Sequence, residues 1–347
     1  MKRMPPQRPT PSATILILLF AALSLFGTPI RAIAGALDEI EIPSAALGRP
    51  LKVSIYRPDG PAPAAGWPVL YLLHGLHGCD RDWAALGGVA KTLDRLIETN
   101  RIAPMLVAMP DAGDSWYVDS ADVGGPGNYQ TALLDDLPRA LERAYPVRRD
   151  REGRAIAGLS MGGFGALRFA LIRPDRFVAV ASLSGAIWQN LPAGGAPGAP
   201  PVSADYFRRV DSSTVVSGID LPPEGRHFGA AFGAPFDPAR FNAANVFTLL
   251  AQRLREGGRL PAIYLTVGDH DSHDLWRGSI ALYETLMADR VDVAFRVTDG
   301  DHAWSLWRRS IEDALAFVDS RFGRPPAEPP LAGVATPRFA GTAATLK

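Results

Sequence analysis

In Ala155-Ile156-Ala157-Gly158-Leu159-Ser160-Met161-Gly162-Gly163-Phe164, a short apolar run leads into a Gly-x-Ser-x-Gly pattern and then into residues that suit a helix. A sharp strand-to-helix turn needs small residues on both sides of the serine, and Gly158 and Gly162 supply them. The following helix directs its positive N-terminal end toward developing negative charge. The pattern therefore predicts a strand, an exposed serine on a tight turn, and a helix. A glycine-rich packing turn is the competing interpretation.

The rest of the chain alternates short apolar runs with amphipathic segments from about Leu37 to Phe322. Nearly continuous apolar runs are typical of parallel strands covered on both faces, so we predict an α/β fold with a mostly parallel central sheet and helices on both faces. The expected strands are Leu51–Tyr56, Val69–Leu73, Met105–Met109, Ala155–Ala157, Val178–Leu183, Ile263–Val267 and Val293–Val297. The expected helices are Val89–Glu98, Thr131–Tyr145, Gly162–Ile172, Phe241–Glu256, Leu275–Ala288 and Ser305–Arg321.

Both ends of the chain lie outside the predicted catalytic domain of residues 37–322. Residues 1–34 have the layout of a secretory signal peptide: Lys2 and Arg3, an apolar run from Ile15 to Phe26, and small residues at 32–34. The run is shorter than the about 20 residues of a membrane-spanning helix, although an uncleaved anchor is the alternative. We expect export to the periplasm or the medium, without stable membrane insertion after the signal is removed.

Two further segments are irregular. Residues 187–238 are rich in Gly and Pro, and this excursion either shapes a substrate pocket, forms a lid, or is a mobile loop. Residues 324–347 form a Pro- and Ala-rich tail that we expect to be disordered.

The composition excludes some classes of site. The 347 residues carry a formal net charge of +0, which gives no indication of nucleic-acid binding. Cys79 is the only cysteine, so no internal disulfide can form, and we interpret it as a small hydrophobic residue. Because Cys and His do not recur at metal-ligand spacing, we expect neither a metal nor a cofactor.

A serine hydroxyl is a weak nucleophile and needs a general base. In a fold of this kind the order along the chain is Ser, then an acid, then His. His302 follows the predicted strand Val293–Val297 and is our candidate base, with His227, His270 and His273 as competitors. The predicted strand Ile263–Val267 is followed by two candidate acids, Asp269 and Asp271, which spacing alone does not separate.

An oxyanion hole needs two backbone N–H groups. Met161, next to Ser160, is one expected donor, and Leu76, in the loop after the strand Val69–Leu73, is the other. We expect His74 and His77 to hold the shape of this loop.

Two aromatic residues, Trp116 and Tyr117, follow the strand Met105–Met109. They are our candidates for substrate binding, with packing as the alternative.

Several motifs together resemble the putative-esterase (esterase D) family. They are Leu73-His74-Gly75-Leu76-His77-Gly78 with Trp83, Gly158-Leu159-Ser160-Met161-Gly162-Gly163, Asn128-Tyr129-Gln130 with Leu137-Pro138, and Gly300-Asp301-His302-Ala303-Trp304 with Trp307. The resemblance runs from about Leu47 to Phe322 and implies a single α/β-hydrolase domain. The Gly-x-x-Asp pattern of the family matches Gly268 and Asp271, so the resemblance selects Asp271 as the acid.

The family includes S-formylglutathione hydrolases, feruloyl and acetyl-xylan esterases, siderophore esterases and mycolyltransferases. S-formylglutathione hydrolases carry serine where His74 stands and cysteine where Gly78 stands, and they are cytosolic, which argues against that substrate here. The resemblance implies a serine hydrolase that acts through an acyl-enzyme on a small-molecule or glycan-linked carboxylic ester, and residues 1–34 predict that it is exported. The alternatives are an acyltransferase with the same three residues, a peptidase, and a non-catalytic binding protein on this scaffold.

Overall fold

The computed structural model describes residues 35–188, residue 190 and residues 227–323. The predicted signal peptide, the predicted tail and most of the 187–238 excursion lie outside the described residues. Among the helices that the structure describes, none has both the length and the apolar character needed to cross a bilayer.

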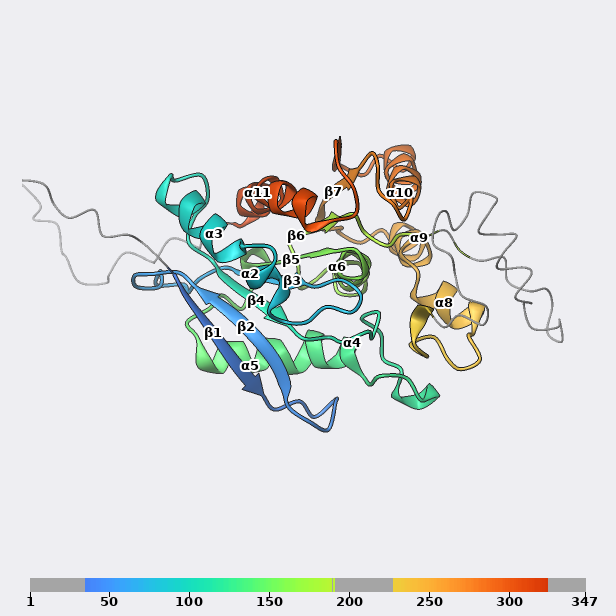
Figure 1. The fold of residues 1–347 in the computed structure, drawn as a ribbon, viewed down its shortest axis with the longest axis horizontal. Helices are drawn as coiled ribbons and strands as arrows, with labels where there is room; N and C mark the ends of the chain where they lie inside the picture. The colour runs from blue at the N-terminus through green and yellow to red at the C-terminus, as the bar shows by residue number, and fades with distance from the viewer. Residues whose placement is uncertain (1–34, 189, 191–226, 324–347) are drawn as a thin grey trace, which may run out of the picture.

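One sheet organises the described residues, with eight strands in the order β1-β2-β4-β3-β5-β6-β7-β8 (Figure 1). Its strands are β1 (Ala36–Ile42), β2 (Leu51–Arg57), β3 (Val69–Leu73), β4 (Leu106–Pro110), β5 (Arg154–Leu159), β6 (Ala179–Leu183), β7 (Ala262–Gly268) and β8 (Val293–Thr298). β2 pairs antiparallel with β1 and β4, and every other pairing is parallel. The predicted α/β fold class is therefore confirmed, and the carboxyl ends of β3 to β8 share one edge.

Helices cover both faces of the sheet (Figure 1). One face carries α2 (Asp82–Ala85), α3 (Val89–Glu98) and α11 (Trp304–Arg321), and the other carries α5 (Leu137–Ala144), α6 (Met161–Ile172), α9 (Val246–Glu256) and α10 (Trp276–Ala288). Alternate residues of a strand point to opposite faces, so Tyr71 and Leu73 of β3 join one core while Leu70 and Leu72 join the other. Burial on both faces explains why β3 is apolar throughout.

The strand β1 is absent from the sequence-based prediction. Its sequence, Ala-Leu-Asp-Glu-Ile-Glu-Ile, has charged residues at three of seven positions, which hides the strand pattern. The strand pairs only with β2 at the sheet edge, where one face stays exposed.

The predicted helix Thr131–Tyr145 contains a π-helical turn between a short helix, α4 (Tyr129–Thr131), and α5. Pro138 has no N–H group, so it cannot donate to the carbonyl of Leu134 as an α-helix requires. The guanidinium of Arg176 donates to that carbonyl instead. The proline thus explains the change in helix type.

The predicted helix Phe241–Glu256 is wrong as a single element, because α8 (Pro238–Ala244) and α9 are separate helices. Asn245 lies between them in an extended conformation, with φ −71° and ψ 143°. Its side-chain oxygen accepts the amide N–H of Phe247 at 3.2 Å, which caps α9. Its side-chain nitrogen donates to the carbonyl of Trp188 at 2.9 Å, so the break also attaches these helices to the segment that follows β6.

Candidate active site

Ser160 stands at the turn between β5 and α6, as the sequence predicts. Its backbone has φ 52° and ψ −120°, a conformation that L-residues rarely adopt. Three hydrogen bonds hold it there: its N–H donates to Leu183 at 2.9 Å, and its carbonyl accepts from Phe164 at 3.1 Å and Ala186 at 2.9 Å. The strained turn leaves the Ser160 side chain partly exposed.

The glycines on either side of Ser160 are required by close backbone approach. A Cβ on Gly158 would lie 2.3 Å from the carbonyl oxygen of Gly162, and one on Gly162 would lie 2.5 Å from the carbonyl oxygen of His74. Both distances are too short for real atoms, so the turn can pack against the loop after β3 only with glycine at these positions.

Ser160, His302 and Asp271 form a hydrogen-bonded chain across three loops. His302 Nε2 lies 3.0 Å from Ser160 Oγ, and His302 Nδ1 lies 2.8 Å from Asp271 Oδ2. The side chain of Asp271 is 0% exposed and that of His302 is 8% exposed. The second carboxylate oxygen of Asp271 accepts the N–H of His273 at 3.0 Å. The residues follow β5, β7 and β8, whose carboxyl ends lie at one edge of the sheet.

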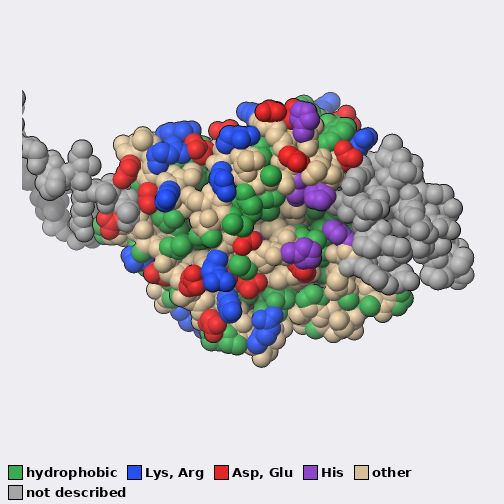
Figure 2. Space-filling model, viewed as in Figure 1, with side chains coloured by type: hydrophobic (Ala, Val, Ile, Leu, Met, Phe, Trp, Pro, Cys, Tyr) green, Lys and Arg blue, Asp and Glu red, His purple; other side chains and the backbone are tan. Residues whose placement is uncertain are grey.

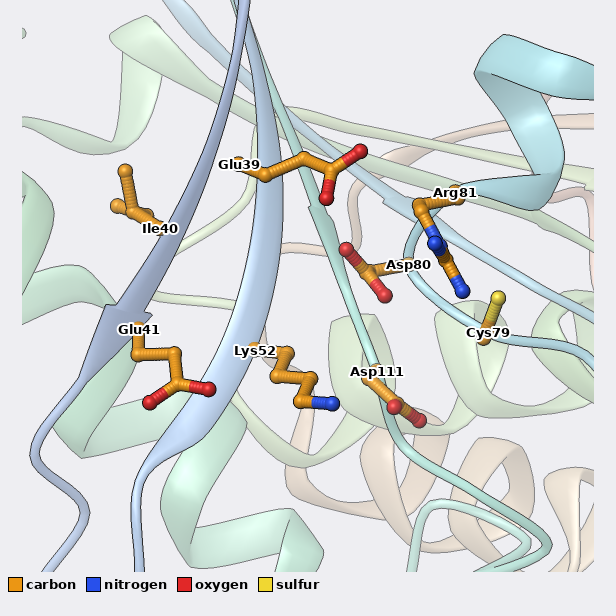
Figure 3. Close-up of a pocket in the computed structure, with 8 residues that line it drawn as sticks. All are labelled: Glu39, Ile40, Glu41, Lys52, Cys79, Asp80, Arg81 and Asp111. Carbon is orange, nitrogen blue, oxygen red and sulfur yellow. The ribbon is translucent and has the colours of Figure 1, made fainter.

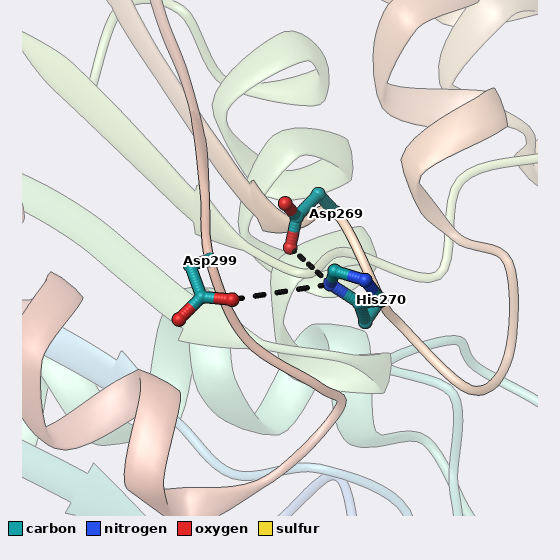
Figure 4. Close-up of side chains that lie close together, drawn as sticks. All are labelled: Asp269, His270 and Asp299. Carbon is teal, nitrogen blue, oxygen red and sulfur yellow. Dashed lines mark hydrogen bonds and ion pairs between the residues drawn. The ribbon is translucent and has the colours of Figure 1, made fainter.

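The other candidate acid, Asp269, lies beside His270 and Asp299 (Figure 4). Its Oδ1 accepts the N–H of Gly300 at 3.1 Å and lies 2.8 Å from Nδ1 of His270. The hydrogen bonds from His270 and Gly300 hold the pKa of Asp269 below its usual value. Asp271 is therefore the carboxylate that contacts His302, whereas Asp269 connects the two loops that follow β7 and β8.

A contact absent from the sequence-based prediction involves Asp301. Its Oδ1 accepts two backbone N–H groups, from His302 at 2.6 Å and from Ser272 at 2.8 Å. These bonds lower the pKa of Asp301 and connect the residue after Asp271 to the residue that carries the imidazole. In the sequence, only the place of Asp301 directly before His302 could have indicated this role, because its partner Ser272 lies 29 residues earlier.

The two expected oxyanion donors lie on either side of the serine. Met161 is the first residue of α6, so its N–H has no partner within the helix. Within the described part of the chain, neither this N–H nor that of Leu76 donates to any group. A Cβ on Gly75, the neighbour of Leu76, would lie 3.4 Å from the Cβ of Ser160, which places this loop against the serine.

His74 and Tyr117 hold that loop in place. His74 is buried, its Nε2 accepts the N–H of Ala112 at 2.9 Å, and its Nδ1 lies 2.7 Å from the carbonyl of Gly75. Burial lowers the pKa of His74, which agrees with a neutral ring that carries its proton on Nδ1. The hydroxyl of Tyr117 donates to the carbonyl of His74 at 2.8 Å.

The two aromatic candidates for substrate binding therefore have different surroundings. Trp116 lines a cavity of about 320 Å³ that also contains Ser160 and His302. Tyr117 is fully buried, does not line this cavity, and packs against Phe169 and the backbone of Gly165. Its position supports the loop rather than a substrate contact.

The cavity is rich in histidine. Four of the six histidines in the sequence line it: His77, His227, His273 and His302. Figure 2 shows histidine side chains gathered on one part of the surface. Among the described residues, His302 is the histidine that hydrogen-bonds to the Ser160 hydroxyl. Of its competitors, His273 packs edge-on against the His302 ring at 4.7 Å, His270 contacts Asp269, and His227 packs against Trp116. Burial and the nearby His302 lower the pKa of His273.

A second cavity, of about 340 Å³, lies beside β1 and β2 (Figure 3). Its lining is charged and includes Lys52, Asp80, Arg81 and Asp111, together with Cys79. None of the hydrogen-bonded chain lines it, so the catalytic geometry belongs to the smaller cavity. Cys79 Sγ lies 3.4 Å from Asp82 Oδ1, a polar contact that its interpretation as a hydrophobic residue did not include.

Comparison with known proteins agrees with this geometry. Residues 44–318 match the family model described as "Putative esterase". An acetyl esterase from Caldicellulosiruptor saccharolyticus is 28% identical over 255 residues, which cover 72% of this chain and 82% of that protein. An esterase from Mycobacterium tuberculosis is 31% identical over 236 residues, covering 62% of this chain and 49% of that protein.

Acyltransferases and solved esterase structures are also similar. A diacylglycerol acyltransferase/mycolyltransferase from Mycobacterium leprae is 30% identical over 155 residues, which cover 43% of each chain. The structure of a ferulic acid esterase matches with a TM-score of 0.62 and 23% identity, covering 84% of this chain and 100% of that one. The family match spans most of the chain, and the protein therefore belongs to the putative-esterase family of serine hydrolases, enzymes with the α/β-hydrolase fold that act on carboxylic esters.

Proposed function

We propose that this protein hydrolyses carboxylic esters through a covalent acyl-enzyme, with Ser160 as nucleophile, His302 as general base and Asp271 as the residue that orients the imidazole. The observation that carries the proposal is the hydrogen-bonded chain from Ser160 Oγ through His302 to the buried Asp271. A carboxylate on Nδ1 fixes the tautomer in which Nε2 is free to accept the serine proton.

In the first half of the reaction, Ser160 Oγ attacks the acyl carbon while its proton moves to His302 Nε2. The imidazolium forms against the Asp271 carboxylate, which stabilises its charge. His302 then gives the proton to the departing alcohol, and the acyl group remains on Ser160. In the second half, His302 takes a proton from water, and the resulting hydroxide attacks the acyl carbon. The bond to Ser160 Oγ then breaks, His302 returns its proton to Oγ, and the carboxylic acid leaves.

The negative charge on the tetrahedral oxygen needs donors that are already in place. The N–H groups of Leu76 and Met161 are our candidates, since both are unpaired and both flank Ser160. The N-terminal end of α6 adds a favourable potential at the same point.

Hydrolysis is favoured over acyl transfer by the extent of the similarities. The acetyl esterase match covers 72% of this chain, whereas the acyltransferase match covers 43%. The cavity of about 320 Å³ suits a small ester group better than a long lipid chain. We infer a small-molecule or glycan-linked ester as substrate, and export directed by residues 1–34.

The nucleophile is tested with a fluorophosphonate probe and p-nitrophenyl acetate. Wild type should label and turn over, and Ser160→Ala should do neither, with a loss of roughly 10⁴-fold or more in kcat. Ser305→Ala is the control, because it removes an exposed hydroxyl in the first turn of α11, close in sequence to His302. Labelling that persists in a correctly folded Ser160→Ala protein would exclude Ser160 as the nucleophile.

Two further measurements address the remaining parts of the proposal. Product analysis with added alcohol or sugar separates hydrolysis from transfer, since an acyltransferase would form a new ester in preference to the free acid. N-terminal sequencing of protein recovered from the periplasm or the medium tests export, and a mature chain that still begins at Met1 would contradict cleavage near residue 34.

A further inference from the structure

Beside the catalytic residues lies a group of rings that the mechanism above does not use. This aromatic cluster consists of Trp116, Trp188, His227 and Phe228. The Trp116 ring centroid lies 5.2 Å from those of Trp188 and His227 and 4.9 Å from that of Phe228. Trp116 and His227 also line the cavity that contains Ser160. Trp116 and His227 therefore form part of the wall that a bound ester would contact, and Trp188 and Phe228 pack against Trp116.

Three ring nitrogens of the aromatic cluster are buried and have no partner among the residues that the structure describes. They are Trp116 Nε1, Trp188 Nε1 and His227 Nε2. Tryptophans elsewhere show the usual arrangement, since Trp83 Nε1 donates to the carbonyl of Leu73 at 2.9 Å and Trp307 Nε1 donates to Ser184 at 3.2 Å. Because a buried unpaired donor or acceptor is costly, three such atoms in one contiguous cluster require an explanation.

The chemistry of these nitrogens limits what can satisfy them. An indole N–H is a donor only. Burial and the nearby His273 and His77 lower the pKa of His227 to about 4, so its ring is neutral at pH 7 and offers one donor and one acceptor. A hydroxyl group can both accept from an indole and exchange a hydrogen bond with a neutral imidazole in either tautomer. An alkyl chain can do neither.

We propose that His227 is a specificity-determining residue: its Nε2 forms a hydrogen bond with a hydroxyl group that the ester substrate carries in addition to its scissile bond. Trp116 Nε1 donates a further hydrogen bond to the same hydroxyl. The inference rests on the proposed esterase function and narrows its substrate class to hydroxylated esters. A plain alkyl ester of the same size would leave these nitrogens unpaired, and sites built to bond a hydroxyl discriminate strongly against analogues that lack it.

The test uses two matched pairs of esters, one that varies the acyl part and one that varies the alcohol part. p-Nitrophenyl 3-hydroxybutyrate is compared with p-nitrophenyl butyrate, and glyceryl monobutyrate with propyl butyrate. In at least one pair, wild type should favour the hydroxylated ester by about tenfold or more in kcat/KM. His227→Leu should lower the kcat/KM for the hydroxylated ester more than that for the plain ester, so that the ratio of the two values falls toward one. His227→Gln, which retains a donor and an acceptor, should restore part of this ratio.

A binding measurement separates this inference from the esterase function itself. In Ser160→Ala the same esters remain uncleaved, and calorimetry should show the same preference, lost in Ser160→Ala/His227→Leu. A binding preference that depends on His227 supports the inference whether or not the wild-type protein turns over esters. Absence of both turnover and labelling in wild type would overturn the proposed reaction and leave the inference about binding intact. Equal binding of both members of each pair by Ser160→Ala, or a preference that persists without His227, would overturn the inference.

Discussion

On one side of the catalytic cavity, the loops after β7 and β8 have their functional polar atoms paired. Asp271 uses both carboxylate oxygens, and Asp301 accepts two backbone N–H groups with one. The aromatic cluster, by contrast, buries three ring nitrogens that have no partner within the described part of the chain. A site that positions its own catalytic groups needs internal hydrogen bonds, whereas a surface that recognises a ligand must leave some bonds for that ligand to make.

The largest expected effect comes from replacing Asp271, the acid in the region where the polar atoms are paired. Asp271→Asn should lower kcat by about 10³- to 10⁴-fold, because an amide can hold His302 in the wrong tautomer and cannot stabilise the imidazolium. Asp269→Asn is the matched control and should change kcat by less than about tenfold, since Asp269 contacts Gly300 and His270 rather than His302. Steady-state kinetics on p-nitrophenyl acetate measures both, and equal losses would contradict the assignment of Asp271.

A smaller effect is expected from Asp301, which acts on position rather than on chemistry. Asp301→Asn weakens the two bonds that connect Ser272 and His302, and should lower kcat by roughly tenfold with little change in KM. The control is Asp299→Asn, because the side chain of Asp299 is 96% exposed and should tolerate the change. Unchanged kcat in Asp301→Asn would show that the other contacts hold the His302 loop without it.

Tyr117 follows Trp116 in the chain and supports the loop that carries Leu76. Its replacement distinguishes a structural role from a contact with substrate. Tyr117→Phe removes the donor to the carbonyl of His74 and should lower the free energy of unfolding by about 1 kcal/mol. It should lower kcat/KM only a few-fold, because Tyr117 does not line the cavity. Denaturant unfolding and kinetics measure the two effects, and a selective rise in KM with unchanged stability would instead indicate a substrate contact.

The smallest expected effect is the pH dependence that His227 contributes to stability. Its folded pKa of about 4 lies below the ordinary value of 6.5, so below pH 6.5 the unfolded chain binds a proton that the folded protein does not. Stability should therefore fall as the pH falls from 6.5 toward 4, by on the order of 1 kcal/mol once solvent screening is allowed for. His227→Phe should flatten this part of the profile in thermal unfolding, and an unchanged slope would contradict the burial of a neutral ring.

Much of the fold and part of the site followed from local sequence. The apolar runs, the Gly-x-Ser-x-Gly turn and the order Ser, Asp, His were readable because each depends on neighbouring residues or on the shared edge of a parallel sheet. The elements that were missed have local sequences that hide them, as in β1 with its charged positions and in the helix interrupted at Asn245.

The sequence by itself determined the α/β fold and the residue types available for catalysis. Only the tertiary structure decided which carboxylate contacts His302, that Tyr117 is buried behind the loop while Trp116 lines the cavity, and that His227 reaches the same cavity as Ser160. The physical reason is that these outcomes depend on where loops from distant parts of the chain meet. Asp269 and Asp271 are two residues apart and chemically identical, so spacing did not separate them; the family pattern favoured Asp271, and their different surroundings show the contact itself.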